Sequence, residues 1–280
     1  MPQAGEVAVV IPARNEADRI QATVSAAIGL PGVAFVVVVD DGSRDDTAVR
    51  AEKAGAAVMR HARSRGKGAA METGAEAARL LEQRDGHGQR HLLFLDADLG
   101  ETAGRAGPLI EPVLAGTADM TIAVFTTTVK LGGHGLVVGF SGAGIRRATG
   151  WQPRQPLNGQ RCLTRAAFEA ARPLAHGFGV ETAMTIDLLR KGMRITEVEV
   201  DLAHRATGTD LKAQLHRARQ LIDVVAVFFR GGKHQPPRTP PARDASRRLI
   251  RPAGRAMKAL RGWATAKLAG ARRGDSGGRK

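Results

Sequence analysis

The chain has 280 residues and a mass of 29.6 kDa, enough for one or two domains with a substantial core. Hydrophobic residues make up 43% and charged residues 25%, so disorder through most of the chain is excluded. The single cysteine, Cys162, excludes an intramolecular disulfide and a cysteine-rich zinc site. No apolar run approaches the roughly 18 residues that cross a bilayer, and no basic segment precedes the first strand-like run at Val7. We therefore expect a cytoplasmic protein.

The net charge of +15 is concentrated near one end of the chain. The first 229 residues carry 27 basic and 25 acidic side chains, whereas the segment from Arg230 to Lys280 carries fifteen basic and two acidic ones. An enzyme body of ordinary charge with a basic tail is predicted, and nucleic acid is not the partner that we expect.

Strand-like and helix-like segments alternate along the chain. Residues 7–11 and 35–39 are continuous β-branched runs, typical of strands buried on both faces, and helical spacing over residues 15–29 lies between them. This pattern predicts an α/β fold with an open, mostly parallel, Rossmann-like sheet flanked by helices. The other expected strands are 56–59, 91–95, 120–125, 160–163 and 194–200, and the other expected helices are 46–54, 69–81, 108–115, 136–149, 181–191 and 210–229.

Polar side chains follow the first two strands. Ligands of open α/β sheets bind beyond the carboxyl ends of the strands, where the residues after Ile11 and Val39 would meet the base and ribose of a nucleotide. The adjacent carboxylates Asp40 and Asp41 repel one another, so they require a ligand, a metal or a hydrogen-bond donor. Asp45, by contrast, is expected only to cap a helix.

A second acidic motif, Asp96-Ala97-Asp98, follows the expected strand 91–95. Two carboxylates at alternate positions offer the hard oxygen ligands that suit Mg²⁺ or Mn²⁺ bridging phosphate groups. Such a cation would neutralise the charge that develops on a diphosphate leaving group. The alternative at this stage is a helix cap or a solvated acidic loop.

A basic loop, Arg63 to Gly68, precedes the expected helix 69–81. Glycine backbones and helix N-termini bind phosphate, and Lys67 would reach a diphosphate. The loop is not a Walker A motif, because Gly68 follows the lysine, and no Gly-x-Gly-x-x-Gly follows the first strand.

Four motifs in this order resemble those of family 2 glycosyltransferases with the GT-A fold. They are Val9–Glu16, Val39–Ser43 with Asp46 and Thr47, Gly66–Ala69 and Asp96–Leu99. The resemblance covers roughly the first 125 residues and implies sugar transfer from a nucleotide-sugar donor with a divalent cation, Mg²⁺ or Mn²⁺. It implies that the nucleotide is bound by Pro12, Ala13, Arg14, Asn15, Glu16, Asp41, Gly42, Ser43, Lys67, Asp96 and Ala97.

The second half is similar to the glucosyl-3-phosphoglycerate synthases and related bacterial transferases. The matching segments are Pro156–Arg161, Gly177–Glu181 and His204–Arg205. This resemblance implies a catalytic role for Glu181 beside the sugar and for Asp98 at the metal, with Asp96 and His204 as further metal ligands. It implies a sugar or acceptor site made by Asn158, Gly159, Gln160, Gly179, Val180 and Arg205.

The function that we predict is a metal-dependent hexosyltransferase that uses a UDP-sugar, with UDP-glucose as the first choice. The acceptor stays open between a lipid-linked group and a small phosphorylated acid, because residues 126–135 depart from the acceptor loop of the synthases. Retention or inversion and a homodimeric state also stay open. The alternatives are a sugar nucleotidylyltransferase, which would need a glycine-rich loop after the first strand, and a cationic adaptor with an inactive transferase body.

The tail begins with a proline-rich linker after Gly231, which predicts a catalytic domain over residues 1–230 and a separate segment over 231–280. Apolar residues recur at helical spacing from Ala253 to Leu268, with Lys and Arg largely off that stripe. A basic amphipathic helix of this kind favours an anchor on an anionic membrane, here the inner face. A disordered cationic tail and a non-specific nucleic-acid binder remain alternatives.

Overall fold

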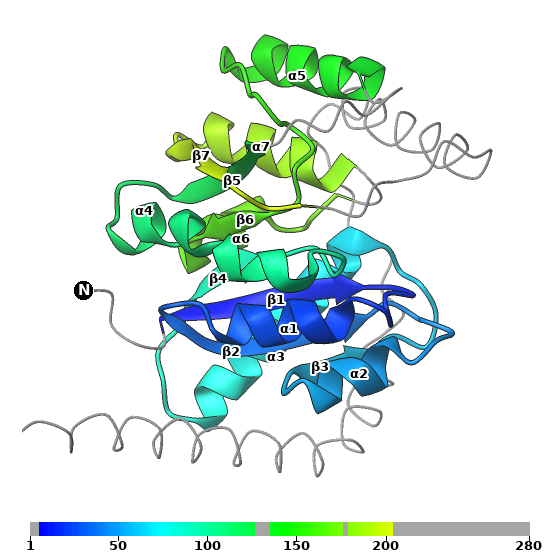
Figure 1. Ribbon diagram of the computed structural model, residues 1–280. Coiled ribbons are helices and arrows are strands. Elements are labelled where there is room, and N and C mark those ends of the chain that lie inside the picture. The colour runs from blue at the N-terminus through cyan, green and yellow to red at the C-terminus, as the bar shows by residue number, and fades with distance from the viewer. Residues whose placement is uncertain (1–5, 127–134, 176–178, 204–280) are drawn as a thin grey trace, which may run out of the picture.

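The computed structural model describes residues 6–126, 135–175 and 179–203 (Figure 1). The strands are β1 (Val7–Ala13), β2 (Val33–Asp40), β3 (Ala57–Arg60), β4 (His91–Phe94), β5 (Met120–Phe125), β6 (Arg161–Leu163) and β7 (Ile195–Val200). The helices are α1 (Ile20–Ile28), α2 (Thr47–Lys53), α3 (Lys67–Arg84), α4 (Glu111–Leu114), α5 (Gly135–Thr149), α6 (Arg165–Ala171) and α7 (Val180–Arg190), with 3-10 turns η1 (Gly100–Arg105) and η2 (Gly107–Leu109).

The seven strands form one sheet in the order β3-β2-β1-β4-β6-β5-β7. All neighbouring pairs are parallel except those of β6, which runs antiparallel to both β4 and β5. The predicted open, mostly parallel α/β sheet is therefore confirmed. The reversal of β6 has a consequence for the site, because it brings the start of this strand to the edge where β1, β2 and β4 end.

Helices cover both faces of the sheet. One apolar cluster packs α1, the 3-10 turns and α4 against one face, and the other packs α3, α6 and α7 against the opposite face. Strand residues alternate between the two clusters, so Val9 and Ile11 face α1 while Ala8 and Val10 face α3. Helix α5 lies beyond α7, farther from the sheet (Figure 1).

The first helix begins at Ile20, five residues later than the apolar spacing predicts. The preceding residues instead make polar contacts with the loop after β2. The backbone N–H of Asn15 donates to Ser43 Oγ at 2.9 Å, and Asn15 Oδ1 accepts from the N–H of Arg44 at 2.9 Å. Asn15 adopts a left-handed φ of 55°, which a helix cannot contain.

Helix α6 was not predicted, although the sequence carries a signal for it. The Oγ1 atom of Thr164 accepts from the N–H of Ala167 at 3.1 Å, the arrangement of a helix N-cap. The expected helix 210–229, the proline-rich linker and the basic tail lie outside the described residues, so the predicted boundary near Gly231 stays a prediction. No described helix has the length and apolar character to cross a membrane.

Candidate active site

Two polar clusters lie at the edge of the sheet where β1, β2 and β4 end. The first surrounds Asp41, directly after β2, and the second surrounds Lys67, the first residue of α3. The loop between β3 and α3 joins the clusters, since it supplies partners of Asp41 and ends at Lys67. The polar segments after β2, β3 and β4 therefore lie close together at this edge of the sheet.

Lys67 joins two carboxylates from distant parts of the chain. Its Nζ atom lies 2.7 Å from Asp96 Oδ1 and 2.8 Å from Glu181 Oε1. Burial alone would lower the pKa of Lys67, but the two carboxylates raise it above the ordinary lysine value. Lys67 is therefore a fixed cation at the sheet edge.

The loop before β6 closes the Lys67 cluster from the other side. Gln160 Nε2 donates to Asp96 Oδ2 at 3.0 Å, so both oxygens of Asp96 contact protein donors. A Cβ atom at Gly159 would lie 2.4 Å from Lys67 Nζ and 2.9 Å from Asp96 Oδ1. A larger residue at this position would therefore displace the Lys67 ammonium group or the Asp96 carboxylate from the contact that joins them.

Four donors surround the buried carboxylate of Asp41. Oδ1 accepts from His61 Nδ1 and from the N–H of Arg65, each at 2.7 Å. Oδ2 accepts from Ser64 Oγ at 2.7 Å and from the N–H of Gly66 at 3.0 Å. Burial acts to raise the pKa of Asp41, but these hydrogen bonds outweigh it and hold the pKa below the ordinary value.

The charge of Asp40 is balanced within the protein as well. Asp40 Oδ1 accepts from the N–H of Ser43 at 2.8 Å, and Arg60 Nε lies 3.1 Å from Oδ2. Protein donors thus satisfy Asp41, whereas the buried Oδ2 atom of Asp40 has an ion pair with Arg60 but accepts no hydrogen bond from the described residues. Asp45 does more than the expected capping: the N-cap of α2 is Asp46, and Asp45 accepts from the N–H of Thr47 at 3.1 Å and from the N–H of Ala17, after β1, at 3.2 Å.

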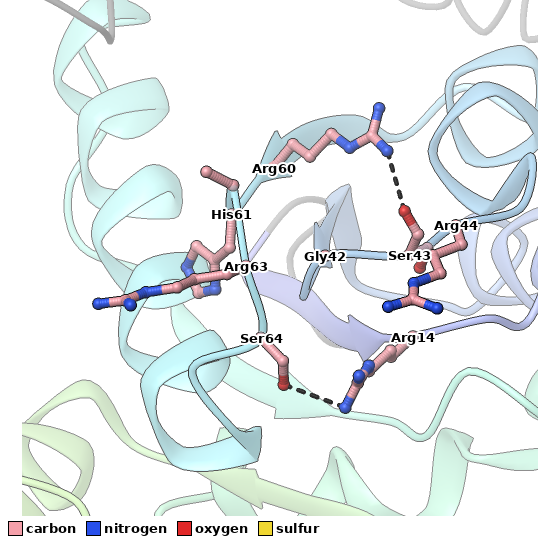
Figure 2. Close-up of a pocket in the computed structure, with 9 residues that line it drawn as sticks. Arg14, Gly42, Ser43, Arg44, Arg60, His61, Arg63 and Ser64 are labelled. Atoms are coloured by element: carbon pink, nitrogen blue, oxygen red, sulfur yellow. Dashed lines mark hydrogen bonds between the residues drawn. The ribbon is translucent and has the colours of Figure 1, made fainter.

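A cavity of about 640 Å³ opens beside Asp41 between the ends of β1, β2 and β3. Figure 2 shows Arg60 bonded to the Ser43 carbonyl and Arg14 bonded to Ser64 at its rim. The residues that line it are Arg14, Gly42, Ser43, Arg44, Arg60, His61, Ala62, Arg63 and Ser64. Three of them, Arg14, Gly42 and Ser43, belong to the predicted nucleotide set, and the guanidinium groups can donate hydrogen bonds to the oxygen atoms of a nucleotide.

Asp98 lies on the turn after β4, and α1 fixes that turn. Thr23 Oγ1 donates to the Ala97 carbonyl and accepts from the N–H of Gly100, both at 2.8 Å. Arg19 Nη1 donates to the Asp98 carbonyl at 3.1 Å. Sequence reasoning missed Thr23 and Arg19, because a threonine and an arginine within a helical pattern carry no signal for a contact with a distant turn.

The acidic motif fits a divalent cation in part. Because Asp96 is bonded to Lys67 and Gln160, Asp98 is the carboxylate of the motif that would hold a metal, with Asp96 behind it. The described residues contain no group of three or more His, Cys, Asp or Glu side chains with metal-ligand geometry. The predicted third ligand, His204, lies outside the described residues, as does Arg205.

The other predicted residues occupy the same edge of the sheet. Pro12 and Ala13 end β1, and the N–H of Glu16 donates to Thr47 Oγ1 at 2.9 Å. Gly179 and Val180 form the start of α7, directly before Glu181. His61 and Ser64, which hold Asp41, were missed, since neither residue type is distinctive on a loop.

Comparison with known proteins identifies the family. The family model described as Glycosyl transferase family 2 matches residues 8–138. The chain is 31% identical to Glycosyltransferase AglJ of Haloferax volcanii over 218 residues, which are 75% of this chain and 67% of that protein. It is 28% identical to glucosyl-3-phosphoglycerate synthase of Mycolicibacterium paratuberculosis over 246 residues, 79% of this chain and 68% of the synthase.

Solved structures agree with these relatives. The fold is similar to glucosyl-3-phosphoglycerate synthase from Mycobacterium tuberculosis in complex with phosphoglyceric acid, with a TM-score of 0.62, 26% identity and coverage of 81% of this chain and 79% of that chain. The complex of that enzyme with Mn²⁺, uridine diphosphate and phosphoglyceric acid gives a TM-score of 0.61 and 25% identity, covering 80% and 78%. With its strand-end motifs gathered at one edge of a GT-A sheet, the chain belongs to glycosyl transferase family 2.

Proposed function

We propose that the chain transfers a hexose from a nucleoside-diphosphate sugar, with UDP-glucose as the first choice, to a phosphorylated acceptor. The observation that carries the proposal is the Lys67 cluster, in which a cation, two carboxylates and an amide from four separate segments meet at the sheet edge. In such a transfer the bond between the anomeric carbon and the diphosphate oxygen breaks, and an acceptor oxygen bonds to that carbon.

The Lys67 cluster supplies the polar groups that this step requires. Lys67 would balance the negative charge that develops on the diphosphate, and its ammonium group is already oriented by Asp96 and Glu181. Glu181 is buried, and its carboxylate would accept hydrogen bonds from the hydroxyls of the transferred sugar. Binding therefore exchanges contacts within the cluster for contacts with the donor.

The second cluster fits the nucleotide. The arginine-lined cavity beside Asp41 would take the nucleoside end of the donor, with Arg14, Gly42 and Ser43 at its rim. Asp41 would not contact the nucleotide directly, because its carboxylate already accepts four hydrogen bonds from the protein. These bonds hold in place the loop that forms one wall of the cavity.

A divalent cation, Mg²⁺ or Mn²⁺, completes the proposal. When bound, it would neutralise the diphosphate as the leaving group departs. Asp98 would hold it, with Asp96 and His204 in support. A crystal structure of the similar synthase contains Mn²⁺ with uridine diphosphate, which supports the assignment.

The acceptor class is proposed from the same relatives. Phosphoglyceric acid occupies the similar synthase, which favours a small phosphorylated acid, whereas the basic tail over residues 231–280 favours a lipid phosphate at a membrane surface. Release of UDP in the presence of 3-phosphoglycerate or of a polyprenyl phosphate in vesicles would distinguish these two arms.

Calorimetric titration of the full chain with UDP-glucose and GDP-mannose, each with and without Mn²⁺, tests the donor proposal. We expect metal-dependent binding of UDP-glucose, weakened at least about tenfold in Asp98→Ala, since removing a metal ligand costs affinity. Asp85→Ala is the matched control, because Asp85 is an exposed carboxylate at the far end of α3. No binding with any cation, or equal binding by Asp98→Ala, would overturn the proposal.

A further inference from the structure

Arg161, the first residue of β6, has a completely buried side chain whose Nη1 lies 4.0 Å from Met120 Sδ of β5 and whose other hydrogen bonds reach two separate segments. Its Nε donates to the Asn158 carbonyl at 2.8 Å and its Nη2 to the Pro156 carbonyl at 3.0 Å. Its Nη1 donates to the Glu181 carbonyl at 3.0 Å and to Thr185 Oγ1 at 2.9 Å. Four of the five guanidinium N–H groups thus join the loop before β6 to the first turns of α7.

The partners of Arg161 are unusual for a buried cation. Within the described residues no carboxylate forms an ion pair with it, and neutral oxygens accept its hydrogen bonds. Burial lowers the pKa of Arg161 to about 10, which still leaves the guanidinium charged at neutral pH. Burying a charged group costs free energy of folding, and an apolar side chain would fill the same space without that cost. The feature that only an arginine supplies here is its planar set of five N–H donors.

Arg165 provides the contrast four positions later. It is also buried, but it forms a bidentate ion pair with Glu82, at 2.7 and 2.9 Å. Its other donors reach the carbonyls of Arg90 and Ala75, and none of these residues belongs to the Lys67 cluster. Arg165 is thus a suitable control for Arg161, because it is a buried arginine whose partners lie outside the Lys67 cluster.

Both segments that Arg161 joins carry side chains of the Lys67 cluster. The loop carries Gln160, whose amide donates to Asp96, and α7 carries Glu181, whose carboxylate contacts Lys67. We infer that Arg161 is a positioning residue that fixes the spacing between the Asn158–Gln160 loop and Glu181, and so the place of the sugar relative to the acceptor. This inference rests on the proposed function.

Steady-state kinetics of Arg161→Lys and Arg165→Lys, combined with calorimetric donor titration, test this role. Lysine keeps the positive charge but cannot form the four hydrogen bonds of the guanidinium group. Misplacement of reacting groups by about 1 Å lowers a reaction rate by up to about 100-fold. We expect Arg161→Lys to lower kcat by about 10- to 100-fold while the donor Kd changes less than about threefold. Arg165→Lys should lower the melting temperature but leave kcat within about threefold.

Amide hydrogen exchange gives a readout that does not need turnover. In Arg161→Lys we expect faster exchange in residues 155–160 and in the first two turns of α7, and in Arg165→Lys unchanged exchange in both segments. Unchanged exchange there in Arg161→Lys, or a normal kcat, would overturn the positioning role. A wild-type chain that turns over no donor would instead overturn the proposed function, and the exchange data would still decide whether Arg161 couples the two segments.

Thr185→Val keeps the inference testable if Arg161→Lys does not fold. The change removes one partner of Arg161 together with the hydrogen bond from the same hydroxyl to the Glu181 carbonyl. Thr121→Val is the matched control, since Thr121 is an equally buried threonine whose hydroxyl also donates to a backbone carbonyl, that of Leu109. We expect kcat to fall by about three- to tenfold in Thr185→Val only. Equal kcat values for the two variants would contradict the inference.

Discussion

The two polar clusters at the sheet edge balance their buried charges in different ways. Asp41 is surrounded by donors from the single connection between β3 and α3, all within 25 residues along the chain. Asp96 is instead held by Lys67 and by Gln160, which lie 29 and 64 residues away. The first cluster needs only β2, β3 and the loop that follows β3, whereas the second exists only when the sheet, α3 and α7 are assembled.

The two clusters also differ in how easily their hydrogen bonds can be exchanged for contacts with a substrate. Backbone N–H groups hold Asp41 in part, and they cannot move away without unfolding the loop between β3 and α3. Lys67, Gln160 and Glu181 make side-chain contacts, which rotate apart at lower cost. We therefore propose that the Lys67 cluster contacts the substrate and that Asp41 shapes the wall of the cavity.

The largest effect is expected for Lys67→Met, which removes the cation while keeping the length of the side chain. Loss of one fixed group that stabilises the leaving diphosphate should lower kcat/KM by roughly 100- to 1000-fold. Lys53→Met on the exposed surface of α2 is the control and should retain wild-type turnover. Steady-state release of UDP measures both. Turnover by Lys67→Met within about tenfold of wild type would show that Lys67 does not stabilise the leaving diphosphate.

A smaller effect, on stability, is expected for Asp41→Asn. Asparagine cannot accept from all four donors, so the free energy of unfolding should fall by about 2 kcal/mol at pH 7. Because the pKa of Asp41 is held below its ordinary value, this contribution is present at neutral pH and is lost as the pH falls below about 4. Urea unfolding at pH 7 and pH 3.5 measures the difference, which should narrow at the lower pH. An equal difference at both pH values would show that hydrogen bonds to the charged carboxylate are not its origin.

Much of the fold could be predicted from the sequence, because buried strands and amphipathic helices leave strong periodic signals. The predicted strand 7–11 lies within β1, and the predicted strand 120–125 has the same bounds as β5. The late start of α1 could not be predicted, since Asn15 takes its conformation from contacts with Ser43 and Arg44, which only the folded loop brings near.

The site was predicted as a set of motifs, but not as a set of contacts. The motifs placed Lys67, Asp96 and Glu181 in one site, and the structure brings these side chains together. The role of Arg161 in contacting the loop and α7 depends on the antiparallel direction of β6, and nothing in three strand residues indicates direction. His204 and the basic tail remain predictions.

A crystal structure of the full chain with Mn²⁺ and UDP-glucose would show whether the donor binds at the Lys67 cluster. We expect Mn²⁺ within about 2.5 Å of a carboxylate oxygen of Asp98 and the glucose within hydrogen-bond distance of Glu181, with Lys67 turned towards the diphosphate. A nucleotide sugar bound elsewhere, with the contacts of Lys67 to Asp96 and Glu181 unchanged, would contradict the proposal that the Lys67 cluster binds the donor.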